Sequence, residues 1–290
     1  MPSSNVLPHA LQTLAIKKLT GKRVVLASAS PRRKAILSVF GLEPEIVPST
    51  FEEDLPISSF GNIHEYPVAT ATHKAVEVYE RLVEADPDNA PDLVIAADTV
   101  VLSHALPSTS QTSYSMLPEV KQELYEKPTS KEDNFRMLLD LNGGVCEVVT
   151  GLVVVYPILT SPGYMIKSID ERSLVYFADN SRELIEAYVE SGEGLALAGG
   201  FAIQGRGGAL VRKVDGDYNN VVGFPAASFF PTAGHVGRRR FRLLGHLEDP
   251  PPWGLLRALL IGKRFNSSMW HTDTDVRKHS FGVLVHGDVG

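Results

Sequence analysis

The sequence has little of what marks secreted, disulfide-linked or membrane-spanning proteins. Its 290 residues include one cysteine, Cys146, which excludes a disulfide within the chain. No apolar run approaches the roughly 20 residues that a membrane-spanning helix needs. The start of the chain also lacks the basic residues and apolar stretch of a signal peptide. We therefore expect a cytoplasmic protein that does not span a membrane.

Basic charge and the common phosphate motifs are scarce as well. Lys and Arg total 28 against 34 Asp and Glu, a net charge of −6, which argues against nucleic acid as a partner. The sequence contains neither GxGxxG nor GxxxxGKS/T, so a phosphate site must be of another kind. Cys146 and His73 stand apart from partners at metal-ligand or nucleophile spacing, which argues against a zinc site and a cysteine protease.

The composition is that of a globular chain whose last part differs from the rest. Hydrophobic residues make up 43% of the chain and charged residues 21%, enough for a core. Residues 231–290 nevertheless carry an excess of basic side chains. We predict an N-terminal extension at 1–22, a folded domain at 23–230 with a loop insertion at 104–123, and a poorly ordered C-terminal extension at 231–290. The arginines at 238–242 are interpreted as part of a solvated tail, with nucleic-acid contact as the weaker alternative.

Apolar periodicity predicts that strands and helices alternate along the folded domain. Ser30 and Pro31 have the residue types of a helix N-cap and first turn, and Gly41 follows the end of that helix. The alternation indicates an α/β layer fold. The predicted strands lie at 23–29, 93–102, 145–156, 164–177, 201–214 and 221–224, and the predicted helices at 31–40, 67–83, 131–141 and 181–189.

One local signal is a group of cations in the first turn of the first predicted helix. Arg32 and Arg33 lie next to the positive end of the helix dipole, which favours acids. A bound phosphate would offset this charge, because helix N–H groups, the Ser28 and Ser30 hydroxyls and two guanidinium groups would all face it. A basic surface turn is the alternative, and the segment alone does not separate the two.

A second signal is Asp98, which lies within an apolar strand. Burying a carboxylate costs several kcal/mol unless a cation, a metal or a hydrogen-bond donor meets it, so the position indicates a site. The alternative is a strand-end Asp satisfied by backbone donors. Glu53 lies in an acidic group at 52–54, which alone is more typical of a solvated loop. Two carboxylates near an arginine pair suit a magnesium-assisted attack on a polyphosphate.

Three further polar residues are candidates for nucleotide contacts. Lys74 and Lys127 have the charge to bind phosphate, although each alone is more often a surface lysine. Gln204 stands between apolar residues and a glycine-rich turn, where its amide suits hydrogen bonding to a base edge. A loop residue capping backbone groups is the alternative for Gln204.

Six motifs in order along 23–230 resemble the Maf family of nucleoside triphosphate pyrophosphatases. The resemblance implies an α/β fold with a central mixed sheet flanked by helices, and two lobes around a cleft. It also implies a homodimer. The motifs are Leu26-Ala27-Ser28-Ala29-Ser30-Pro31-Arg32-Arg33, Ala97-Asp98-Thr99-Val100-Val101, Glu126-Lys127-Pro128, Val149-Thr150-Gly151, Ile203-Gln204-Gly205 and Asn220-Val221-Val222-Gly223-Phe224-Pro225.

The resemblance also implies a reaction and a set of roles. A nucleoside triphosphate would be hydrolysed between its α- and β-phosphates, with Mg²⁺ or Mn²⁺, to a nucleoside monophosphate and pyrophosphate. Asp98 matches the base that activates water, and Glu53 matches its partner at the metal. Arg32 and Arg33 match the phosphate-binding pair. Lys74 and Lys127 match the lysines that would neutralise charge moving to the leaving group.

The positions linked to substrate choice in this family are Arg32, Thr99 and Gln204. Their pattern is similar to the branch that takes dTTP and UTP, and it extends the prediction to modified pyrimidine nucleotides. The chain departs from the family at 194–197, where Gly, Leu, Ala and Leu replace a run with proline, an acid and a base. Two alternatives follow: a nucleotide-binding regulatory protein with weak turnover, and the same chemistry on methylated GTP.

Overall fold

The computed structural model describes residues 5–104, 122–158, 163–234 and 280–283. Most of the predicted loop insertion, residues 105–121, and most of the predicted C-terminal extension lie outside these residues. Within them, no helix is both long enough and apolar enough to cross a membrane.

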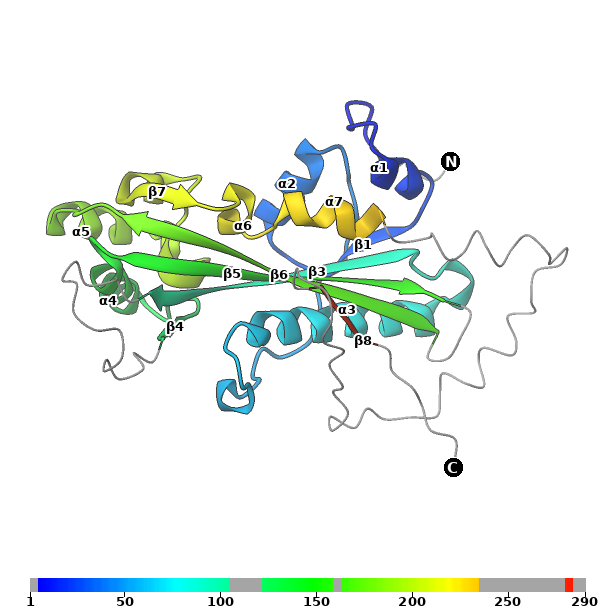
Figure 1. The fold of residues 1–290 in the computed structure, drawn as a ribbon, viewed down its shortest axis with the longest axis horizontal. Coiled ribbons are helices and arrows are strands. Elements are labelled where there is room, and N and C mark those ends of the chain that lie inside the picture. The colour runs from blue at the N-terminus through cyan, green and yellow to red at the C-terminus, as the bar shows by residue number, and fades with distance from the viewer. Residues whose placement is uncertain (1–4, 105–121, 159–162, 235–279, 284–290) are drawn as a thin grey trace, which may run out of the picture. The chain divides into compact units, whose positions relative to one another are not determined.

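One mixed sheet contains the eight strands found among the described residues (Figure 1). Its order is β2-β1-β3-β5-β6-β7, with β4 paired to β3 and β8 paired to β6. Strand β1 is parallel to β2 and β3, whereas the pairs β3–β4, β6–β7 and β6–β8 are antiparallel. This confirms the predicted mixed α/β fold. The strands are β1 (Val24–Leu26), β2 (Glu45–Ile46), β3 (Leu93–His104), β4 (Leu124–Tyr125), β5 (Val145–Pro157), β6 (Tyr164–Phe177), β7 (Val211–Asp215) and β8 (Ser280–Val283).

The four predicted helices are all present, and two of them begin at a serine whose side chain caps the first turn, Ser130 and Ser181. Pro31 is the first residue of its helix, as predicted. Ser130 caps the helix that begins at Lys131 by accepting a hydrogen bond from the Asp133 N–H at 3.1 Å. The α-helices of the described residues are α1 (Leu14–Leu19), α2 (Pro31–Val39), α3 (Glu65–Ala85), α4 (Lys131–Leu141), α5 (Arg182–Glu190), α6 (Tyr218–Val222) and α7 (Ala226–Gly234).

The chain divides into two compact units. Unit 1 takes its described residues from 1–98, 151–170 and 226–290, and unit 2 from 99–150 and 171–225. Three of the four boundaries fall inside β3, β5 and β6, so each unit contains one part of each long strand, and the fourth lies between α6 and α7. The predicted domain end at 230 falls inside α7, which belongs to unit 1 and continues through Pro231. Part of the predicted N-terminal extension, helix α1, also belongs to unit 1.

The core of unit 1 forms where α3 covers the sheet (Figure 1). Ala71, Ala75 and Val78 are fully buried and pack against residues of β1, β3, β5 and β6. A Cβ atom added to Gly151 of β5 would lie 2.5 Å from the backbone of Pro67, so α3 approaches the strand at backbone distance. Glycine is required there because any side chain would push the helix away.

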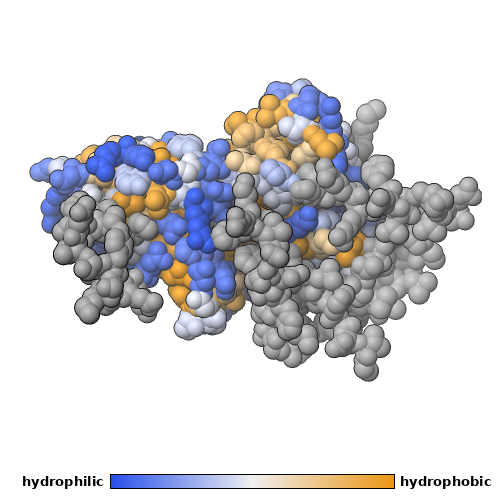
Figure 2. Space-filling view, viewed as in Figure 1, coloured by the Kyte–Doolittle hydropathy of each residue, from blue (hydrophilic) through white to orange (hydrophobic). Residues whose placement is uncertain are grey.

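Helices α1, α2 and α7 lie together elsewhere in unit 1. The ring of Phe40, just after α2, meets that of Phe230 on α7 edge-to-face at 5.2 Å between centroids. Figure 2 shows apolar atoms exposed around α1 and α2. Three of the exposed large apolar residues come from this part of the sequence, namely Leu11, Leu14 and Val39.

The core of unit 2 lies between α4, α5 and the strands. Met137 and Leu138 of α4 and Ile185 of α5 are buried together with residues of β5 and β6. Cys146 belongs to this core, and burial raises the pKa of its thiol well above the ordinary value. A raised pKa keeps the thiol protonated and unreactive, so Cys146 acts as a small apolar core residue.

In unit 2 one predicted strand is correct only at its end, where 211–214 lie in β7, and another is wrong. The stretch predicted as a strand at 201–214 turns through the 3₁₀ helix η5 (Arg206–Leu210) before β7 begins. The chain turns back tightly here, since a Cβ atom at Gly207 would lie 2.8 Å from the Ala202 nitrogen. The predicted strand at 221–224 overlaps α6, which Asp217 caps by accepting the Asn219 N–H at 2.7 Å and which ends at Gly223 with φ +117°.

Candidate functional site

The predicted phosphate-binding turn lies between β1 and α2 in unit 1. Ser28 is buried, and its Oγ accepts hydrogen bonds from Arg33 Nη1 at 3.0 Å and from the Ser30 N–H at 3.2 Å. Ser30 occupies the N-cap position of α2 with extended backbone. The turn therefore holds one guanidinium in a fixed orientation at the start of a helix, where backbone N–H groups favour anions.

The charge on Arg33 faces the two predicted carboxylates. Burial lowers the pKa of Arg33 below its ordinary value, while the negative charges of Asp98 and Glu53 act in the opposite direction. The positive charge of Arg32 also lowers the pKa of Arg33. The structure thus brings the predicted arginine pair and both predicted acids into one electrostatic environment.

Lys74 connects the two carboxylates directly. Its Nζ lies 2.8 Å from Asp98 Oδ1 and 2.8 Å from Glu53 Oε1. The side chains of Lys74 and Asp98 are 10% and 12% exposed, whereas that of Glu53 is 43% exposed. The buried Asp98 is therefore met by a cation, one of the partners that its position in an apolar strand requires. We call Glu53, Lys74 and Asp98 the acid–lysine group.

Thr99 follows Asp98 on β3, and two of the six sequence motifs converge on it in unit 2. Thr99 Oγ1 lies 3.0 Å from Thr150 Oγ1, and Thr150 Oγ1 donates to the Asn220 carbonyl at 3.3 Å. The Asn220 amide in turn donates to the Val148 carbonyl at 3.1 Å. Sequence analysis assigned these two motifs no chemical role, and in the structure Thr150 and Asn220 position the hydroxyl of Thr99.

Gln204 lies in an exposed turn of unit 2, held by a residue that sequence reasoning missed. The two carboxylate oxygens of Glu193 each accept a backbone N–H at 3.1 Å, one from Arg206 and one from Gly207. Glu193 therefore fixes the backbone just after Gln204. Glu193 lies directly before residues 194–197, where the sequence departs from the family pattern, and this position could have drawn attention to it. The local sequence does not indicate that its carboxylate reaches residues 13 and 14 positions away.

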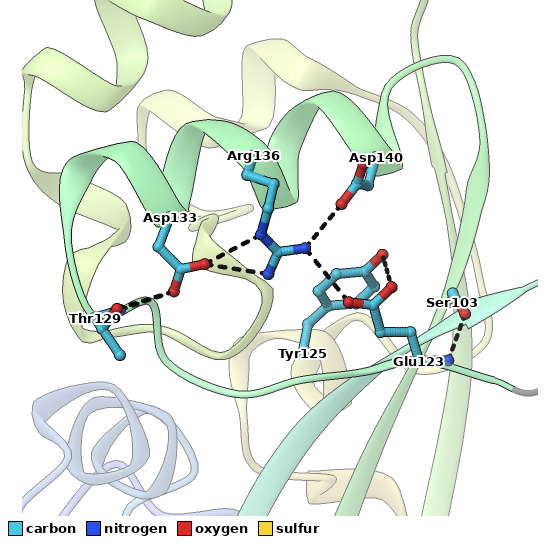
Figure 3. A network of polar contacts seen from close by, with 7 residues as sticks. All are labelled: Ser103, Glu123, Tyr125, Thr129, Asp133, Arg136 and Asp140. Carbon is cyan, nitrogen blue, oxygen red and sulfur yellow. Dashed lines mark hydrogen bonds and ion pairs between the residues drawn. The ribbon is translucent and has the colours of Figure 1, made fainter.

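Lys127 is exposed on a bend between β4 and α4. Hydrogen bonds and ion pairs hold the chain on both sides of this bend. After the bend, the Thr129 N–H donates to Asp133 Oδ2 at 3.0 Å. Before it, the chain is tied to α4 through the network of Figure 3. Arg136 is the centre of that network and pairs with three carboxylates, those of Glu123 at 3.3 Å, Asp133 at 3.1 Å and Asp140 at 3.0 Å.

The stretch at 194–197, where the sequence departs from the pattern that the resemblance implies, forms a close-packed turn. The 3₁₀ helix η3 (Glu193–Ala196) contains Gly194, where an added Cβ would lie 2.1 Å from the Gly200 carbonyl oxygen. Asn134, which is fully buried, donates to the same oxygen at 2.9 Å. The chain thus supports this turn through backbone contact at a glycine.

Gly194→Ala is expected to lower the free energy of unfolding by about 2 kcal/mol, because the added methyl group must displace backbone. Urea denaturation measures the change. Gly61→Ala is the matched control, since a Cβ atom there meets nothing within 4 Å. Equal stability of the two variants would contradict the close contact at Gly194.

Comparison with known proteins gives a family for this arrangement. The sequence model described as Maf-like protein matches residues 23–233. The chain belongs to the Maf family. The family match ends close to the end of α7 and includes the acid–lysine group, the arginine turn and the turn that carries Gln204.

Curated relatives within this family carry consistent names. The chain is 43% identical over 218 residues to the probable bifunctional dTTP/UTP pyrophosphatase/methyltransferase protein of Homo sapiens, an alignment that covers 74% of this chain and 32% of that protein. It is 35% identical over 235 residues to the dTTP/UTP pyrophosphatase of Schizosaccharomyces pombe, with 79% and 90% covered. Identity to the dTTP/UTP pyrophosphatase of Thermococcus kodakarensis is 37% over 202 residues, with 70% and 90% covered. The chain thus spans about a third of the human relative and most of the other two.

The acid–lysine group also bears on the divalent metal that the family resemblance implies. Among the described residues, no three His, Cys, Asp or Glu side chains are grouped to hold a metal ion. Glu53 and Asp98 nevertheless share one cation. Mg²⁺ is commonly held by one or two carboxylates together with substrate phosphates, so this pair fits an ion that binds with a nucleotide.

Proposed function

We propose that this chain hydrolyses dTTP and UTP to the nucleoside monophosphate and pyrophosphate. The observation that carries the proposal is the Lys74 ammonium that joins the buried Asp98 to Glu53 close to Arg33, in a family with relatives named dTTP/UTP pyrophosphatase. Carboxylates that accept a proton from water, next to cations that bind polyphosphate, are the groups that this hydrolysis needs.

Residues of unit 1 bind the phosphates, accept a proton and hold the metal. Ser28, Ser30, Arg32 and Arg33 bind the phosphates at the start of α2, where charge-assisted hydrogen bonds are strong. Asp98 accepts the proton of the attacking water. Mg²⁺ or Mn²⁺, held by Glu53 and Asp98, would supply Lewis-acid polarisation of a phosphoryl oxygen when bound.

The remaining residues stabilise the leaving group and choose the base. Lys74 and Lys127 neutralise charge as it moves onto pyrophosphate. Gln204 offers a donor and an acceptor on one amide, which matches the O4 and N3–H edge that thymine and uracil share. Thr99, held by Thr150, and Arg32 complete the choice of substrate. We also infer that the protein is a cytoplasmic homodimer, which light scattering and cell fractionation would test.

Pyrophosphate release from a panel of nucleotides tests the proposal. The panel contains dTTP, UTP, CTP, GTP, methylated GTP and a modified pyrimidine nucleotide, each with Mg²⁺ or Mn²⁺. We expect kcat/KM for dTTP and UTP to exceed that for the others by at least about tenfold, in the range that one well-placed hydrogen-bonding group provides. A preference for methylated GTP, or nucleotide binding without release, would contradict the proposal and favour one of the two alternatives.

A further inference from the structure

The segment that carries Glu53 is fastened to one stripe of α3. His73, Glu77 and Arg81 are spaced four residues apart and therefore lie along the same side of the helix. Glu77 makes the most contacts with the segment. Its Oε2 accepts hydrogen bonds from Ser49 Oγ at 2.7 Å and from the Thr50 N–H at 3.2 Å, and its Oε1 accepts one from Thr50 Oγ1 at 3.0 Å.

The other two residues of the stripe hold the segment on either side of these bonds. Arg81 Nη2 donates to the Pro48 carbonyl at 3.0 Å. The Phe51 ring stacks on the His73 ring, with 4.8 Å between centroids and 7° between planes. Four consecutive residues, 48–51, are thus attached to α3 immediately before the acidic group.

Glu77 is fixed in its charged form by these contacts. Burial alone would raise its pKa, but hydrogen bonds from Arg81, Ser49 and Thr50 outweigh this and lower the pKa below the ordinary value of a glutamate. Arg81 Nε lies 2.6 Å from Glu77 Oε1, so the same guanidinium orients the carboxylate and holds the segment. Charge-assisted bonds of this kind are stronger than neutral ones.

Glu53 depends on such support because burial does not hold it. Its side chain is 43% exposed, yet its carboxylate must meet Lys74 at 2.8 Å. We propose that Glu77 is a positioning residue, which holds the segment 48–53 on α3 so that Glu53 stays within reach of Lys74 and of a divalent cation. This inference rests on the proposed function, since Glu53 matters there as a metal ligand.

The test compares Glu77→Ala and Glu77→Gln with the wild-type chain. We expect Glu77→Ala to lower kcat for dTTP by about tenfold, since small displacements of reacting groups have effects of this size or larger. The half-saturating Mn²⁺ concentration, measured by electron paramagnetic resonance without nucleotide, should rise several-fold while KM for dTTP changes less than about twofold. Glu77→Gln keeps one acceptor oxygen, so its kcat and its half-saturating Mn²⁺ concentration should lie between those of the wild type and Glu77→Ala.

Glu84→Gln is the matched control, because Glu84 is an exposed glutamate on the same helix. Unchanged kcat and Mn²⁺ binding in Glu77→Ala would overturn the proposal, and so would equal losses in the control. If the wild-type chain releases no pyrophosphate, the proposed function fails, and hydrogen exchange and Mn²⁺ binding then decide this inference separately. Faster exchange of the Thr50 amide with weaker Mn²⁺ binding in Glu77→Ala would support it, and wild-type values of both would overturn it.

Discussion

Asp98→Asn is expected to lower kcat for pyrophosphate release from dTTP by about a thousandfold, a typical loss for removal of a general base. The amide has nearly the shape of the carboxylate and can still accept a hydrogen bond from Lys74, whose Nζ lies 2.8 Å from Asp98 Oδ1 in the wild-type chain. It cannot accept a proton from water. Nucleotide affinity, measured by calorimetry in the same variant without divalent metal, should change by less than about threefold because Asp98 is not one of the proposed phosphate ligands.

Asp88→Asn provides the control for this experiment. Asp88 is an exposed residue of the short 3₁₀ helix η2 (Pro87–Asn89), so the substitution makes the same chemical change away from the acid–lysine group. Its kcat should equal that of the wild type. Turnover of Asp98→Asn within a few-fold of the control would show that another group activates the water.

Lys74→Met is expected to have the second largest effect, on stability and on metal binding together. The substitution leaves Asp98 buried and Glu53 close to it without their shared cation. We expect the free energy of unfolding at neutral pH to fall by about 2 kcal/mol, less than for a fully buried pair because Glu53 is partly exposed. Urea denaturation measures the loss.

The affinity for a divalent metal should rise in Lys74→Met, although its stability falls. In the wild-type chain the Lys74 ammonium contacts one oxygen of each carboxylate that would hold a divalent cation. Without it, Mn²⁺ should bind several-fold more tightly and restore much of the lost stability, while turnover falls. Lys131→Met, which removes an exposed ion pair with Glu190, should change neither. Weaker Mn²⁺ binding in Lys74→Met would contradict competition between the ammonium and the metal.

Sequence patterns predicted the parts of the fold whose signals are local. The periodicity of α3 and the continuous apolar run of β3 are properties of single segments, and both elements formed as predicted. The strand predicted at 221–224 failed because its apolar residues also fit one turn of helix. There a cap at Asp217 and a left-handed glycine at Gly223 decided the outcome.

The candidate site shows the same division. Asp98 was found from its own surroundings, since a carboxylate in an apolar strand is conspicuous. Glu77 was not, because a glutamate four residues before an arginine on a helix is typical of a surface ion pair. Its contacts with Ser49 and Thr50 join residues 27 to 28 positions apart, and only the fold brings them together.

The close approach of α3 to β5 at Gly151 has a consequence for how the family can vary. Main-chain atoms, with no side chain between them, set the separation of helix and strand at Pro67. Lys74 lies two turns further along the same helix, so a rigid backbone contact determines its height above the sheet. Apolar residues beneath the rest of α3 can therefore be replaced by others of similar volume while the Lys74 ammonium stays within hydrogen-bond distance of Asp98.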